Sequence, residues 1–171
     1  MVSERRAGRA PASLALLALV PPLLLAAPSC RAETDDVALK AAYIYNIAQF
    51  TVWPAVAVAR PFHVCVGSAH ALWESLRKLQ GKMVGERRWA VVEPAPGIAC
   101  DVAVLPAGAH RPQDDNSGTL TIVDEPLAGY AGAVALIEED QHLRFDIDTK
   151  EAARAGLRFS SRLLRLARNV R

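Results

Sequence analysis

The sequence predicts a single-domain α/β sandwich, in which a mixed parallel and antiparallel sheet is flanked by helices. An apolar stripe with helical spacing lies near the beginning of the domain. Short apolar runs separated by turn signals follow it, and two alternating segments near the end have the pattern of a β-hairpin. The 171 residues are enough for one domain of ordinary size.

The stretch 40–54 begins as an amphipathic helix. An apolar stripe with the spacing i, i+4, i+7 and i+11 is formed by Val37, Ala41, Ile44 and Ala48, and is widened by Ile47 and Phe50. Asp36 and Lys40 are an acid–base pair at i, i+4 on the opposite side, which we expect to face solvent. Trp53 precedes Pro54, and a residue before proline avoids helical geometry, so the helix should end close to this point.

Short apolar runs predict the strands of the sheet. Buried strands are expected over residues 62–67, 89–92, 100–105 and 120–123. Segments 133–137 and 143–147 face each other across an acidic turn, which is typical of a hairpin. The second arm alternates apolar and charged residues, so this antiparallel pair should lie near an edge of the sheet with one face in water.

Three further helices are expected between and after these strands, and one of them is a short helix that Thr149 caps and that ends at Gly156. Residues 69–80 place leucines on one face, and Gly81 is a natural stop signal. A final helix should start at Ser160 or Ser161. Its core-facing side is predicted to consist of Leu163, Leu164, Leu166 and Ala167.

Residues 1–32 have the features of a secretory signal peptide. Arg5, Arg6 and Arg9 form a positive beginning, and the apolar run 12–27 follows. This run is short for a membrane span and is interrupted by two prolines, which favours a signal peptide over a transmembrane helix.

The position of cleavage has two alternatives. A cut after Ala32 would remove Cys30 with the signal, whereas a cut after Ser29 would leave Cys30 first. In the second case Cys30 would be available for a lipid anchor, although the residues before it match a lipoprotein box poorly.

The charge balance argues against nucleic acid as a partner. The formal net charge is +2, but residues 1–32 contain four arginines and one glutamate. Without them the domain has 16 basic and 17 acidic side chains and is close to neutral. A general nucleic-acid binder needs a dense basic face, so we expect no nucleic-acid binding.

No arrangement of residues in the sequence predicts catalysis. His63, His70, His110 and His142 are scattered without metal-ligand spacing, and there is no GxSxG nucleophile motif and no phosphate-binding glycine loop. The acidic residues 138–140 fit a solvated hairpin turn better than a catalytic carboxylate pair. We therefore expect no enzyme, no catalytic residue, no metal and no cofactor.

Four stretches resemble a known family. These are AAYIYNIAQFTVWP, FHVCVGS, ACDVAVLP and RFDIDTKEAARAGLRFSSRLLRLARNV. They resemble the YfiR-type (YfiR/HmsC-like) family of periplasmic regulators over nearly all of residues 33–171. The resemblance implies a periplasmic domain that binds the periplasmic part of a membrane-anchored diguanylate cyclase and holds it inactive. Envelope stress or redox state would thereby control cyclic di-GMP and biofilm formation.

The resemblance also implies a disulfide bond between Cys65 and Cys100. From the residues alone, two buried free thiols remain the alternative. A bond between them would close a loop of about 35 residues and contribute roughly 4 kcal/mol in the chain-entropy account. The family can carry a second disulfide, but no cysteine follows Cys100 here. A redox response that depends on a second bond is therefore not expected.

The partner surface is predicted at Phe159, Arg162 and Leu163, where an extended segment meets the last helix. We keep self-association into a homodimer as a further alternative. A different function is a periplasmic small-molecule sensor or accessory protein that serves a sensor kinase or an outer-membrane receptor. A ligand-sized cavity lined by Trp53, Tyr43 or Trp89 would favour that function.

Overall fold

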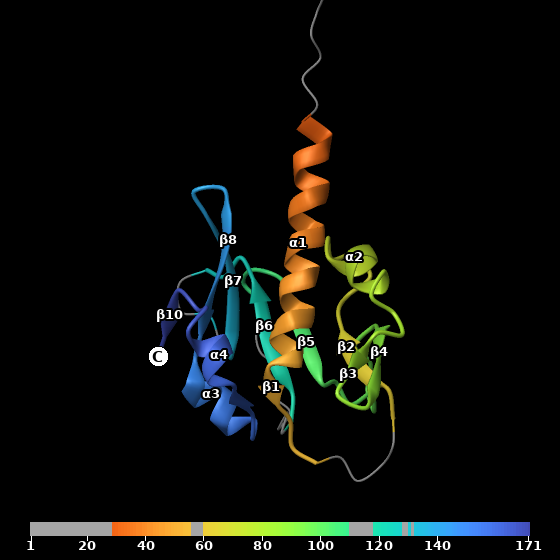
Figure 1. Cartoon of the computed structure of the whole chain (residues 1–171). Helices are drawn as coiled ribbons and strands as arrows, with labels where there is room; N and C mark the ends of the chain where they lie inside the picture. The colour runs from red at the N-terminus through yellow and green to blue at the C-terminus, as the bar shows by residue number, and fades with distance from the viewer. Residues whose placement is uncertain (1–28, 56–59, 110–117, 128–129, 131) are drawn as a thin grey trace, which may run out of the picture.

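The computed structural model of the chain describes residues 29–55, 60–109, 118–127, 130 and 132–171 (Figure 1). The helices in these ranges are α1 (Ser29–Gln49), α2 (Trp73–Arg77), α3 (Thr149–Arg154) and α4 (Ser161–Leu164). The strands are β1 (Thr51–Val52), β2 (Phe62–Cys65), β3 (Met83–Val84), β4 (Arg87–Val92), β5 (Val102–Leu105), β6 (Leu120–Asp124), β7 (Val134–Glu139), β8 (His142–Ile147), β9 (Arg158–Phe159) and β10 (Asn169–Val170). The predicted signal 1–32 lies outside the described residues except for its last four, which form the first turn of α1.

The predicted mixed sheet is confirmed. One sheet has the strand order β10-β8-β7-β6-β5-β2-β4-β3, and a second, small sheet pairs β1 with β9. Strands β4, β2, β5, β6 and β7 pair in parallel, whereas β7–β8 and β3–β4 are antiparallel. The chain places β4 on one side of β2 and β5 on the other, so the strand order reverses beside β2. The β7–β8 pair is the expected hairpin, and only β10 separates it from the edge.

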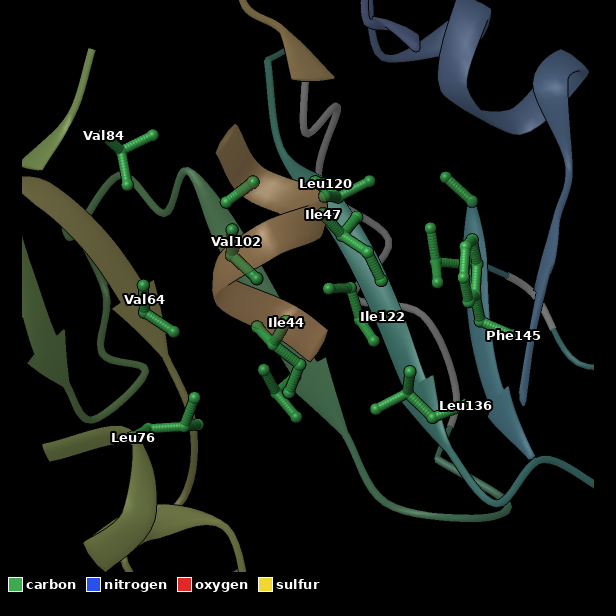
Figure 2. Close-up of a cluster of buried hydrophobic side chains, with 14 of the residues drawn as sticks. Ile44, Ile47, Val64, Leu76, Val84, Val102, Leu120, Ile122, Leu136 and Phe145 are labelled. Atoms are coloured by element: carbon green, nitrogen blue, oxygen red, sulfur yellow. The ribbon is translucent and has the colours of Figure 1, made fainter. Parts of the chain in front are cut away.

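Helix α1 covers one face of the sheet, with α2 beside it (Figure 1). The predicted stripe is the buried one, because Ala41, Ile44, Ile47 and Ala48 are at most 2% exposed. Figure 2 shows Ile44 and Ile47 pointing at side chains of the central strands, among them Val102 and Ile122. Burying each such aliphatic side chain stabilises the fold by about 1.5–3 kcal/mol, so this contact holds α1 to the sheet.

The opposite side of α1 differs from the prediction at Lys40. The side chain of Lys40 is 9% exposed and its Nζ lies 3.0 Å from Asp124 Oδ1 at the end of β6. It also forms an ion pair with Glu125. The prediction that Lys40 faces solvent was wrong, because residues distant in sequence supply carboxylates that compensate its burial.

Of the three later helices, α2 and α4 are shorter than the sequence suggested, and α3 is capped by Asp148 instead of Thr149. The predicted helix 69–80 contains only the five residues of α2, because turns precede and follow it. The final helix ends at Leu164, and Leu166 is 64% exposed instead of buried. The chain leaves the helical path here because the N–H of Arg168 bonds to the carbonyl of Phe145, which starts the pairing of β10 with β8.

Within the described ranges, no helix combines the length and the apolar character that a membrane crossing requires.

Candidate functional site

The two cysteines of the folded domain are joined. Cys65 ends β2 and is 2% exposed, and its sulfur is bonded to that of Cys100, with 5.7 Å between the two Cα atoms. Cys100 lies just before β5, which pairs with β2. The bond therefore ties the segment that leads into β5 to the strand beside it, across a sequence separation of 35 residues.

A buried carboxylate follows Cys100. Asp101 is 2% exposed and accepts hydrogen bonds from Arg60 Nη2 at 3.0 Å, Arg87 Nη1 at 2.8 Å and the backbone N–H of His63 at 2.8 Å. Its own N–H bonds to the carbonyl of His63, and its carbonyl accepts from Leu120 N–H. This cluster joins the beginnings of four neighbouring strands. The sequence does not predict this cluster, because its residues are far apart in the chain and follow no regular spacing.

The predicted partner residues lie near each other but differ in accessibility. Phe159 is half-buried in β9, opposite Thr51 of β1. Leu163 is only 3% exposed and belongs to the hydrophobic core. A direct partner contact by Leu163 is therefore contradicted by its burial. Arg162 is exposed, and its guanidinium carbon lies 5.4 Å from the centre of the Phe50 ring.

The arginines of the C-terminal region form two groups. Some are paired: Arg168 bonds to Asp146 and Glu139, and Arg171 lies 3.3 Å from Asp148. The hydrogen bond from Arg168 lowers the pKa of Asp146. In contrast, no described residue forms an ion pair with Arg158, Arg162 or Arg165, and all of these side chains are exposed. The sequence contains a signal for the three unpaired arginines, because no acidic residue follows Glu151 and could pair with them locally.

The three arginines without an ion pair among the described residues border exposed apolar side chains. Val52 is 51% exposed and pairs with Arg158 across β1 and β9. Leu166, in the turn after α4, is 64% exposed. We refer to Val52, Arg158, Arg162, Arg165 and Leu166 as the β9–α4 surface. Exposed apolar side chains beside arginines that form no ion pair are typical of a protein–protein interface.

A groove opens at the end of α1. It has a volume of about 420 Å³ and is lined by Gln49, Trp53, Val84, Glu86 and Arg87 among others. Of the three aromatic residues predicted for a ligand cavity, only Trp53 lines it. Trp89 is fully buried in the core, and Tyr43 packs edge-on against Phe145.

The structure offers no metal centre among the residues that it describes, because no group of three or more His, Cys, Asp or Glu side chains could hold an ion there. His110 lies outside those residues. His63 and His142 each bond to a backbone carbonyl, Ala99 and Asp140 respectively, and are not brought together.

Comparison with known protein families shows to which family the chain belongs. The model of the YfiR/HmsC-like family matches residues 37–168. The chain belongs to the YfiR/HmsC-like family. The match covers α1 from Val37 onward, all of the sheet except β10, and the β9–α4 surface. A search among curated proteins finds no significant match.

Proposed function

We propose that this YfiR/HmsC-like chain is a periplasmic regulatory protein that represses a membrane-anchored diguanylate cyclase by binding its periplasmic domain. Through this binding it links envelope stress or redox state to cyclic di-GMP and biofilm formation. The family match over residues 37–168 is the observation that carries the proposal.

The β9–α4 surface is the part of the domain that we assign to the partner. Arg158, Arg162 and Arg165 form no ion pair with a carboxylate among the residues that the structure describes, so an acidic segment of the cyclase domain could supply carboxylates to them. Val52 and Leu166 supply the apolar contact beside these charges. We retain Phe159 as a residue that supports this surface from β9, because it is only half-buried.

Cyclic di-GMP in a strain that lacks the gene tests the function directly. We expect the cyclic di-GMP level to rise, because the cyclase loses its repressor, and a plasmid copy should restore the original level. An unchanged level in the deletion strain would reject repression of a cyclase.

Charge reversal tests the surface. The double variant Arg162→Glu with Arg165→Glu should weaken binding to the purified periplasmic domain of the cyclase by about 10- to 100-fold, because it places like charges against an acidic partner. Binding is measured by calorimetry at two salt concentrations, and the wild-type affinity should fall with salt.

The matched control makes the same change of charge on α2, as Arg77→Glu with Lys78→Glu. These side chains are exposed and lie away from the β9–α4 surface. Equal weakening by both double variants would show a general charge effect and would contradict the assigned surface.

The groove beside Trp53 favours a second function, that of a small-molecule sensor serving a sensor kinase or an outer-membrane receptor. An aromatic wall next to polar groups such as Gln49 is typical of small-ligand sites. Under this function an aromatic metabolite should raise the melting temperature of the wild-type protein, and Trp53→Ala should remove the rise. No rise with any compound of a broad metabolite panel would count against it.

A further inference from the structure

The turn between β2 and α2 carries a histidine whose two ring nitrogens have different surroundings. The side chain of His70 is 8% exposed. Its Nδ1 accepts a hydrogen bond of 3.2 Å from the backbone N–H of Leu72. Its Nε2 has no hydrogen-bond partner among the described residues and lies 4.0 Å from Asp124 Oδ2. A neutral imidazole accepts only at the nitrogen that lacks a proton, so the proton of His70 is on Nε2.

His70 holds the start of α2 in two ways. Its ring accepts from Leu72, and its backbone carbonyl accepts from Trp73 N–H at 3.0 Å. Leu72 is fully buried and directly precedes α2, where no side chain caps the helix. The first N–H groups of a helix have no partner within it, and the His70 carbonyl satisfies the first of them while the imidazole fixes the residue directly before the helix.

Charged groups from two other elements face this ring. Asp124 comes from the end of β6 and Lys40 from α1, and Lys40 is also paired with Glu125. Burial opposes the charge of Lys40, but hydrogen bonds with Glu125 and Asp124 outweigh it and raise the pKa of Lys40. Burial lowers the pKa of His70, and Lys40 acts in the same direction, whereas Asp124 opposes them. The neutral ring is therefore the resting state near pH 7.

We propose that His70 is a pH-sensitive latch on the start of α2. When the ring is neutral, Nδ1 accepts the N–H of Leu72 and holds the turn. When a proton from solvent binds Nδ1, two N–H groups face each other, and the hydrogen bond from Leu72 is lost. The charged ring is then attracted to the carboxylate of Asp124, and this attraction favours movement of the ring away from the Leu72 N–H. The first turn of α2 loosens as a result.

The free energy of unfolding should depend on the protonation of His70. In the unfolded chain a histidine has a pKa of about 6.5, whereas the folded His70 has a lower pKa. The unfolded state therefore binds more protons in mildly acid solution. The stabilising contribution of His70 is complete above pH of about 6.5 and is lost as the pH falls below that value.

Nuclear magnetic resonance on the wild-type protein tests the latch without a mutation. The His70 ring and the protection of the Leu72 amide against hydrogen exchange are followed from pH 7.5 to pH 5. We expect the Leu72 protection factor to fall about fivefold, which corresponds to the free energy of one ordinary hydrogen bond. The pH midpoint of this fall should equal the pH midpoint of the change in the His70 ring signals. A Leu72 amide that keeps its protection while the His70 ring becomes charged would overturn the proposal.

A variant pair separates the latch from general acid effects. His70→Asn keeps an acceptor oxygen but does not titrate, so Leu72 protection should become independent of pH. His142→Asn alters an exposed histidine on β8 and should leave the pH dependence unchanged. A pH dependence that persists in His70→Asn would contradict the latch.

If the latch serves to sense acidification outside the cytoplasm, that role rests on the proposed periplasmic location. The latch itself does not. The resonance experiment can succeed whether or not cyclic di-GMP changes in the deletion strain, so the two proposals fail separately.

Discussion

Removing the disulfide by the double substitution Cys65→Ala with Cys100→Ala should lower the free energy of unfolding by about 4 kcal/mol. The bond links positions 35 residues apart, and without it the unfolded chain gains the conformational freedom of that loop. Replacing both cysteines avoids leaving one reactive thiol, which would confuse the comparison.

Urea unfolding of the oxidised wild type and of the double variant measures this difference. Adding a reductant should destabilise the wild type by a similar amount and leave the double variant unchanged. A variant as stable as the oxidised wild type would contradict a stabilising role for the bond. A loss in the variant without any response of the wild type to reductant would show that the bond is inaccessible, which argues against a redox switch at this position.

Replacing Asp101 by alanine should cost about 3 kcal/mol of unfolding free energy. The substitution leaves Arg60 and Arg87 without their shared carboxylate and the backbone N–H of His63 without an acceptor. We take the lower end of the range for broken buried ion pairs, because the arginine side chains are 24% and 16% exposed.

The matched control is Glu74→Ala on α2. Glu74 is exposed and its ion pair with Arg77, at 3.4 Å, is solvated, so its loss should change stability by less than about 1 kcal/mol. Both variants are compared with the wild type by urea unfolding at pH 7. Equal effects of Asp101→Ala and Glu74→Ala would show that the buried cluster contributes no more than a surface pair.

The effects of the disulfide and of Asp101 should not add. Cys100 and Asp101 are adjacent, and both fix the beginning of β5 against β2. Once one of them is removed this segment is already loosened, so the triple variant should lose less than the sum of the two effects.

The first helix and the hairpin are the elements that the local sequence pattern predicted correctly. The stripe through Ala41 and Ile44 predicted the buried face of α1, because periodic burial leaves a periodic apolar pattern. The alternation around Phe145 predicted the β7–β8 pairing in the same way. The short strands β1, β3 and β10 were missed. Two-residue strands have no period, and pairing across the sheet creates them.

The partner surface itself stays a prediction, and the structure decides only which of its residues are accessible. Arg162 lies where the arginine-rich end suggested, exposed and next to Phe50. Leu163 was predicted both for the core-facing side of the last helix and for the partner surface, and its burial confirms the first prediction and contradicts the second. Arg158 and Arg165 join the proposed surface because the structure shows that they are exposed and form no ion pair with a described residue, which their sequence positions do not reveal.

The sequence by itself determined the class of fold, the apolar face of α1, the hairpin and, through resemblance, the YfiR/HmsC-like family. These features depend on the order and period of residues along the chain. Only the tertiary structure decided that Lys40 is buried with Asp124, that Asp101 joins several strands and that His70 accepts from Leu72. The physical reason is that burial and compensation of polar groups depend on contacts between residues that are far apart in the chain, and no local pattern records which of them meet.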